Sequence, residues 1–245
     1  MKGWRIFLHS ARMVIDNLGA ALRVSMVLYL VQVASQLTFF VNAPMAGEQP
    51  TAVPEGLGLQ LTLSIFALLA SLWIAVAWHR YVLTGELPAG LLPRWHGSEI
   101  ARYFGQSLLI GLVVILAALA AGVVIGLVAT AVPGFGGVLI FGLLGLCSYL
   151  FFRLGLVLPA AALGRRMTIG ESWAATRDDD GAVVTLAVLV IGVGLLVEVP
   201  ALLDQDSGSL IALVYRVVLN WFVTMIGVSV LTTLYGHFVE HRPVD

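Results

Sequence analysis

Residues 104–132 read FGQSLLIGLVVILAALAAGVVIGLVATAV, a run without a single charged side chain. An α-helix rises 1.5 Å per residue, so about 20 apolar residues cross the roughly 30 Å hydrocarbon core of a bilayer. The run is therefore long enough to span a membrane as a helix. It is continuously apolar and lacks the alternation that marks the strands of a transmembrane barrel.

Five further stretches have the same character, so the sequence predicts an all-α, polytopic membrane protein. Of the residues, 60% are hydrophobic and 11% are charged, whereas soluble domains carry about 25% charged residues. This hydropathy and a net charge of −1 exclude a disordered chain and a nucleic-acid partner. The six-helix transmembrane domain covers residues 22–245, with spans at about 22–42, 58–82, 104–132, 138–163, 182–203 and 209–236.

The basic residues predict how the spans are oriented. Eleven of them lie before or early in the first span, around the second–third and fourth–fifth connectors, and in the C-terminal tail, whereas the other three connectors contain none. Because connectors rich in Lys and Arg stay on the cytoplasmic side, we expect both termini in the cytoplasm of a bacterium, with the chain in its inner membrane. We interpret residues 22–42 as an anchor rather than a cleaved signal peptide.

Residues 1–21 have a different pattern, that of an amphipathic interfacial helix. This pattern favours a helix that lies in the cytoplasmic headgroup region and binds acidic lipid. The alternative is that it docks against the protein's own bundle or a partner. The apolar side carries Trp4, Phe7, Leu8, Ala11, Val14, Ile15 and Leu18, and the polar side carries Lys2, Arg5, His9, Arg12 and Asp16.

Polar residues inside the spans form the first candidate site. Glu198 and Arg216 lie at matching depth in the fifth and sixth spans, roughly 10 Å from their outer ends, and pairing would offset the cost of burying either charge. Such groups either join helices by hydrogen bonds or line an outward-facing polar cavity that holds a substrate or headgroup. The predicted intramembrane polar cluster is Gln32, Gln36, Glu198, Arg216, Asn220 and Thr224.

The cytoplasmic ends of the spans form the second candidate site. Thr168 and Glu171 have the spacing of a capping box, which predicts a short helix that begins there. Arg153 is expected to snorkel towards the interface or contact a lipid phosphate. We interpret Asp178–Asp180 as a solvated turn. The predicted cytoplasmic interface consists of Arg153, Ser172, Trp173, Thr176, Arg177, His79 and Arg80.

The region from Tyr149 to Arg177 resembles bacterial multi-pass proteins of the glycerophosphodiester phosphodiesterase membrane-domain type and related uncharacterised six-span families. The features in common are Arg153, Pro159, Gly170-Glu171-Ser172-Trp173 and Thr176-Arg177. In those proteins the catalytic barrel is a separate domain, so the resemblance implies a six-span layout and no activity.

The sequence contains no signature of an intramembrane enzyme, since Ser148 and Ser229 lack a protease motif. We therefore expect a non-enzymatic inner-membrane protein without a cofactor or metal, an accessory or scaffold in an envelope or lipid-linked process. The alternative is a permease subunit that works with a separate ATPase, which would dock on the 83–102 connector near Trp95. The expected partners are the lipid bilayer and another membrane protein or an ATPase.

Overall fold

A computed structural model of the chain describes residues 2–41, 56–88, 90–132, 134–203 and 210–244, except for the side chains of 40–41, 198–203 and 210–212. Every regular element in these ranges is a helix. The elements are α1 (Lys2–Asp16), α2 (Leu18–Val41), α3 (Leu57–Thr84), α4 (Gly97–Ala131), α5 (Gly136–Leu154), α6 (Val157–Ala162), α7 (Ile169–Ala175), the 3-10 helix η1 (Arg177–Asp179), α8 (Asp180–Leu203) and α9 (Leu210–Phe238).

Six helical stretches in the described ranges are long and apolar enough to cross a membrane, as the sequence predicts. They are Leu18–Phe39, Leu57–Thr84, Gly97–Ala131, Gly136–Ala162, Arg177–Val197 and Leu213–Phe238. Each overlaps one predicted span. The continuous apolar runs fix these helices because a helix satisfies its own backbone hydrogen bonds, which lipid cannot do.

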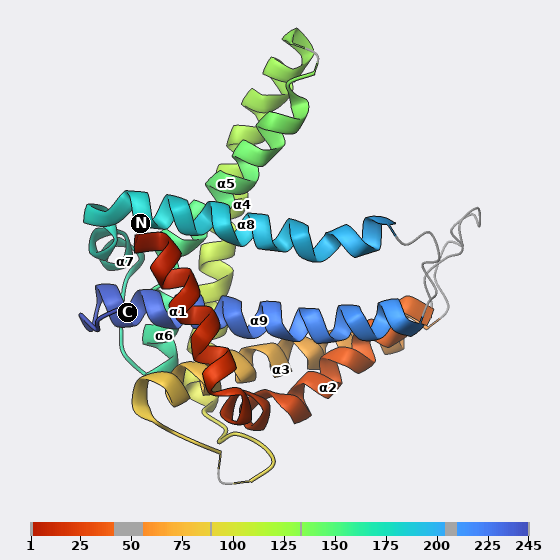
Figure 1. The fold of residues 1–245 in the computed structure, drawn as a ribbon, viewed down its shortest axis with the longest axis vertical. Coiled ribbons are helices and arrows are strands. Elements are labelled where there is room, and N and C mark those ends of the chain that lie inside the picture. The colour runs from red at the N-terminus through yellow and green to blue at the C-terminus, as the bar shows by residue number, and fades with distance from the viewer. Residues whose placement is uncertain (1, 42–55, 89, 133, 204–209, 245) are drawn as a thin grey trace.

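The body of the molecule consists of α2, α3, α8 and α9 with the short helices packed on them (Figure 1). Helix α2 packs along α3, and α9 lies against both. The start of α2, the end of α3, helices α6 and α7 and the end of α9 form one end of this body, which we call the basal end. Both termini lie there. Several of the largest fully buried side chains, among them Trp78, Leu156 and Tyr235, belong to this region.

Helix α1 packs across α8 and α9 (Figure 1). Its buried residues, Gly3, Ile6, Ser10 and Val14, recur at helical spacing. A Cβ atom at Gly3 would clash with the carbonyl oxygen of Ala182 in α8, so glycine is what allows this close approach. The contact face is rotated from the predicted apolar side, and Trp4, Ile15 and Leu18 are exposed.

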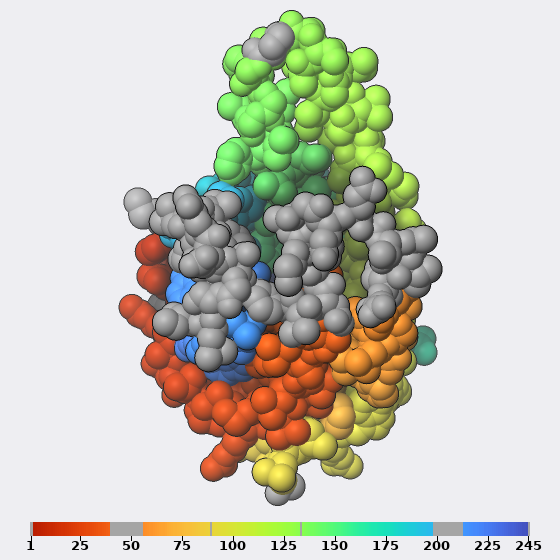
Figure 2. Space-filling model, turned by 90° about the vertical axis from the view of Figure 1, so that its right-hand side faces the viewer, coloured from red at the N-terminus to blue at the C-terminus, as the bar shows by residue number. Residues whose placement is uncertain are grey.

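Helices α4 and α5 form a hairpin that projects steeply from the body (Figures 1 and 2). The buried residues of α4 all lie in its first part, namely Ile100, Tyr103 and Ile110. Those of α5 all lie at its last turn, from Phe152 to Leu154. Beyond these points a few partly buried side chains still touch the body, among them Val113, Val114 and Tyr149. Further out the two helices lie against each other, and their outward sides are exposed.

The predicted fourth span is divided between α5 and α6. Proline has no N–H, so Pro159 cannot donate to the carbonyl of Gly155 one turn earlier. That carbonyl instead accepts the N–H of Leu158, at 3.0 Å, and the helix is interrupted at residues 155–156. Both sides of the break are buried, and α6 thereby packs against α4 and α9.

Candidate functional site

Helix α9 is joined to α3 by two buried hydrogen bonds in the basal half of the body. The indole N–H of Trp78 donates to the hydroxyl oxygen of Ser229 at 2.7 Å. The Nδ1 atom of His79 lies 2.8 Å from the hydroxyl oxygen of Thr232. Since the Thr232 hydroxyl donates to the carbonyl of Val228, the proton of this contact belongs to His79 Nδ1. His79 Nε2 then accepts from the Tyr103 hydroxyl of α4, at 3.4 Å.

The same arrangement joins α2 to α9. The indole N–H of Trp221 donates to the hydroxyl oxygen of Ser25 at 2.8 Å, while Ser25 donates to the carbonyl of Ala21. Each of these hydroxyl groups therefore gives its proton to its own helix and accepts an N–H from a neighbouring helix. This arrangement satisfies polar groups that would otherwise be costly in an apolar surrounding. Tyr29 adds a hydrogen bond from its hydroxyl to the carbonyl of Val217, at 2.7 Å.

The structure does not bring the predicted intramembrane polar cluster together among its described side chains. Gln32 and Gln36 of α2 are half-buried, and no hydrogen bond joins either to Arg216 or Asn220 within that part of the chain. Arg216 and Asn220 are exposed. The side chain of Glu198 lies outside the described residues, so the predicted ion pair with Arg216 remains a prediction.

Three residues of the predicted cluster, Arg216, Asn220 and Thr224, recur every four residues along α9 and lie in line with the side of this helix that faces the core further along. Leu234 lies 18 residues after Arg216, about five helical turns, and is fully buried. Leu231 lies seven residues after Thr224, about two turns, and is also buried. In the basal half of α9 this side is apolar and packed against the core. In the outer half it is polar and exposed.

Arg153 lies at the centre of a second group of contacts, where α5, α7 and α8 meet. It is 2% exposed. Its guanidinium donates to the carbonyl of Thr176 at 2.6 Å and pairs with the Asp180 carboxylate at 2.6 Å. The same group lies over the ring of Trp173, 4.2 Å from the ring centre, which is a cation–π distance. Tyr149 also donates to Asp180, at 3.1 Å.

Further hydrogen bonds fix the start of α7 and hold this helix against Arg153. The predicted capping box is confirmed, since Glu171 N–H donates to the Thr168 hydroxyl and Thr168 N–H donates to the Glu171 carboxylate. Ser172 is fully buried and donates to the Arg153 carbonyl at 2.7 Å. The Thr176 hydroxyl turns back to the carbonyl of Ser172, at 3.1 Å. Ser172, Trp173 and Thr176 therefore all hold or surround Arg153.

These contacts differ from two expectations. Arg153 is buried in the protein rather than extended towards headgroups, because its guanidinium binds the Thr176 carbonyl and the Asp180 carboxylate and lies over the ring of Trp173. Asp178–Asp180 is more than a solvated turn, since Asp179 pairs with Lys2 of α1 at 2.6 Å and Asp180 pairs with Arg153. The sequence could have indicated these pairs only through its charge pattern, because nothing local brings Lys2 and Asp179 together.

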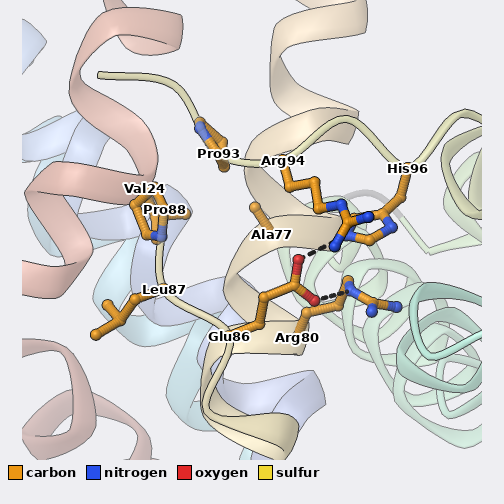
Figure 3. Close-up of a pocket in the computed structure, with 9 residues that line it drawn as sticks. All are labelled: Val24, Ala77, Arg80, Glu86, Leu87, Pro88, Pro93, Arg94 and His96. Atoms are coloured by element: carbon orange, nitrogen blue, oxygen red, sulfur yellow. Dashed lines mark hydrogen bonds and ion pairs between the residues drawn. The ribbon is translucent and has the colours of Figure 1, made fainter. Parts of the chain in front are cut away.

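The remaining residues of the predicted cytoplasmic interface, His79, Arg177 and Arg80, have different surroundings in the structure. His79 lies in the core, fully buried, and not at an interface. Arg177 is exposed in η1. Arg80 donates through Nε to the Glu86 carboxylate at 2.7 Å, and the other oxygen of Glu86 lies 2.7 Å from Nε2 of His96 (Figure 3). Burial alone would raise the pKa of Glu86, but the hydrogen bonds and charges of His96 and Arg80 outweigh it and lower that pKa.

Comparisons with protein-family models, with curated proteins and with solved structures find no match to this chain. The resemblance of residues 149–177 to a membrane-domain family therefore remains a prediction. The functional interpretation therefore rests on the structure of this chain.

Proposed function

We propose that this chain is a non-enzymatic multi-pass protein of a bacterial inner membrane, with cytoplasmic termini, that serves as an accessory or scaffold in an envelope or lipid-linked process. The observation that carries the proposal is the use of the buried polar groups. Ser25, Ser229, Thr232 and His79 would be the natural nucleophiles or bases of an intramembrane enzyme, and each is instead engaged in a bond between helices.

The bare hairpin supports the scaffold role. Along α4 and α5, large side chains such as Leu119, Val123 and Phe141 are more than half exposed in the described structure. In a bilayer such a surface meets lipid tails or the spans of another membrane protein. A body held rigid by hydrogen bonds that carries an uncovered apolar hairpin suits a protein that organises other membrane components.

The scaffold role is tested by purification from native membranes with a matched pair of variants. We expect the wild-type chain to retain a membrane protein that is lost when Leu119 and Val123 are replaced by alanine. The control replaces Val184 and Val188 of α8, which are similarly exposed, and should retain the partner. The proposal is contradicted if both variants retain the same proteins as wild type, or if a turnover is found that His79→Gln abolishes without loss of folded protein.

A permease subunit that works with a separate ATPase is the second candidate. The observation that favours it is the connector between α3 and α4, where Leu91 is 84% exposed and Trp95 is 55% exposed. On this function the two side chains would meet the ATPase. Stoichiometric co-purification of an ATPase that is lost with Trp95→Ala would support it.

A further inference from the structure

The connector between α3 and α4, residues 85–88 and 90–96, runs back along α3. The chain turns at Gly85, whose φ of 75° favours glycine. The Trp73 indole then donates to the carbonyl of Arg94 at 3.3 Å, and the rings of Trp73 and Trp95 pack edge to face with centres 4.7 Å apart. Trp73 lies eleven residues before the end of α3 at Thr84, about 16 Å along the helix axis.

Two kinds of contact hold the connector at this level. The Glu86 carboxylate bridges Arg80 and His96, so the one acidic group of the connector is paired with α3 (Figure 3). Pro93 is buried, and Ala77 of α3 and Val24 of α2 line the same small hollow beneath the connector. Non-helical backbone is tolerated at membrane depth where protein surrounds it, and these contacts supply that surrounding.

The outward side of the connector is apolar to a degree that is unusual for a loop in water. Four large side chains of the connector are exposed, with exposed fractions of 51% for Leu87, 84% for Leu91, 43% for Leu92 and 55% for Trp95. Arg94 lies among them and is also exposed. Tryptophan and leucine beside an arginine form the composition that protein segments use at the boundary between acyl chains and headgroups.

We propose that this connector is a re-entrant segment that lies in the bilayer leaflet at the basal end, with Leu91, Leu92 and Trp95 against lipid. Its depth along α3 and its side-chain chemistry together favour lipid over water. Arg94 is placed to reach a lipid phosphate, as long arginine stems do near helix ends. The proposal depends on the membrane assignment and not on the scaffold role, and it competes with docking of an ATPase at the same residues.

The test uses the full-length chain in liposomes of phosphatidylethanolamine and phosphatidylglycerol. Cys147, the chain's single cysteine, is replaced by serine, and Leu91→Cys is labelled with a polarity-sensitive fluorophore. Asp178→Cys, also exposed at the basal end, is the matched control. Quenching is measured with iodide in the water and with nitroxide-labelled lipids, and size-exclusion chromatography confirms that both variants are folded.

We expect the label at residue 91 to emit at shorter wavelength than that at 178. Its iodide quenching should be several-fold weaker, and only this label should be quenched by nitroxide lipids. The proposal is overturned if iodide quenches both labels equally and lipid nitroxides quench neither. It is also overturned if residue 91 is shielded in native membranes but open to iodide in liposomes, since a protein partner would then cover it.

Discussion

The basal half of the body and the α4–α5 hairpin are both built from apolar helices, yet the side chains of one are packed and those of the other are largely exposed. The packed region contains Trp78, His79, Ser229 and Thr232, which bond between helices. The bare part of the hairpin, from residue 111 to residue 147, contains no charged residue and contributes no fully buried side chain to the described core.

We interpret this difference through the physics of helix packing in a bilayer. Lipid tails are as apolar as leucine, so apolar surface alone gives no preference for a neighbouring helix over lipid. Polar side chains do give that preference, because lipid cannot satisfy them.

The largest difference is expected between two leucine truncations. Leu234→Ala removes a fully buried side chain next to the helix-joining hydrogen bonds, and should lower the free energy of unfolding by about 2–3 kcal/mol. Leu119→Ala, at 63% exposure on the hairpin, should change it by less than about 0.5 kcal/mol. Unfolding in mixed micelles measures both. Equal effects would mean that the hairpin is packed as tightly as the body.

The Arg153 contacts should be the next most sensitive. Arg153→Met keeps the apolar stem but removes the hydrogen bond to Thr176, the pair with Asp180 and the cation–π contact, at a cost of about 2 kcal/mol. Asp178→Asn, which changes a carboxylate of the same acidic run, is the control and should have little effect. A protease-accessibility assay of residues 163–179 should detect loosening only in the arginine variant.

A smaller loss of stability is expected from a substitution where α1 closely approaches α8. Gly3→Ala places a methyl group against the Ala182 carbonyl and should cost about 1–2 kcal/mol, with α1 detached from the body. Gly19→Ala, where nothing lies within 4 Å, should be neutral or slightly stabilising. Cross-linking between cysteines at Ser10 and Thr233 measures attachment. An undiminished cross-link in the Gly3 variant would contradict the packing described for α1.

The smallest effect is expected from a change in pH, which acts on the connector through Glu86. Because the folded state lowers the pKa of Glu86, its contribution to stability is present above its unfolded pKa of about 4.5 and is lost as the pH falls through the lowered pKa of the folded state. Between pH 7 and pH 5 we therefore expect no change in the position of the connector from this group, and a loosening only at more acidic pH. Fluorescence of a label at Leu91 reports this change. Glu86→Gln should remove the acid transition, and a transition that survives the substitution belongs to another group.

The sequence predicts the helices well because each depends on its own residues. Each of the six long stretches overlaps one predicted span, with ends that differ by at most seven residues, and the capping box at Thr168 starts α7 as expected. The sequence does not predict the steep projection of the hairpin or the pairing of Asp179 with Lys2, because both depend on contacts between distant segments. It places His79 at a helix end, whereas neighbouring helices bury it.

We propose that the α4–α5 hairpin crosses the membrane while the basal end lies on the cytoplasmic side. Single cysteines at Phe135 and Asp178, in a Cys147→Ser background, test it with a membrane-impermeant thiol reagent on intact spheroplasts. The account predicts that residue 135, at the hairpin tip, reacts at once and that residue 178 reacts only after the membrane is broken. Reaction of both before lysis, or of residue 178 alone, would contradict it.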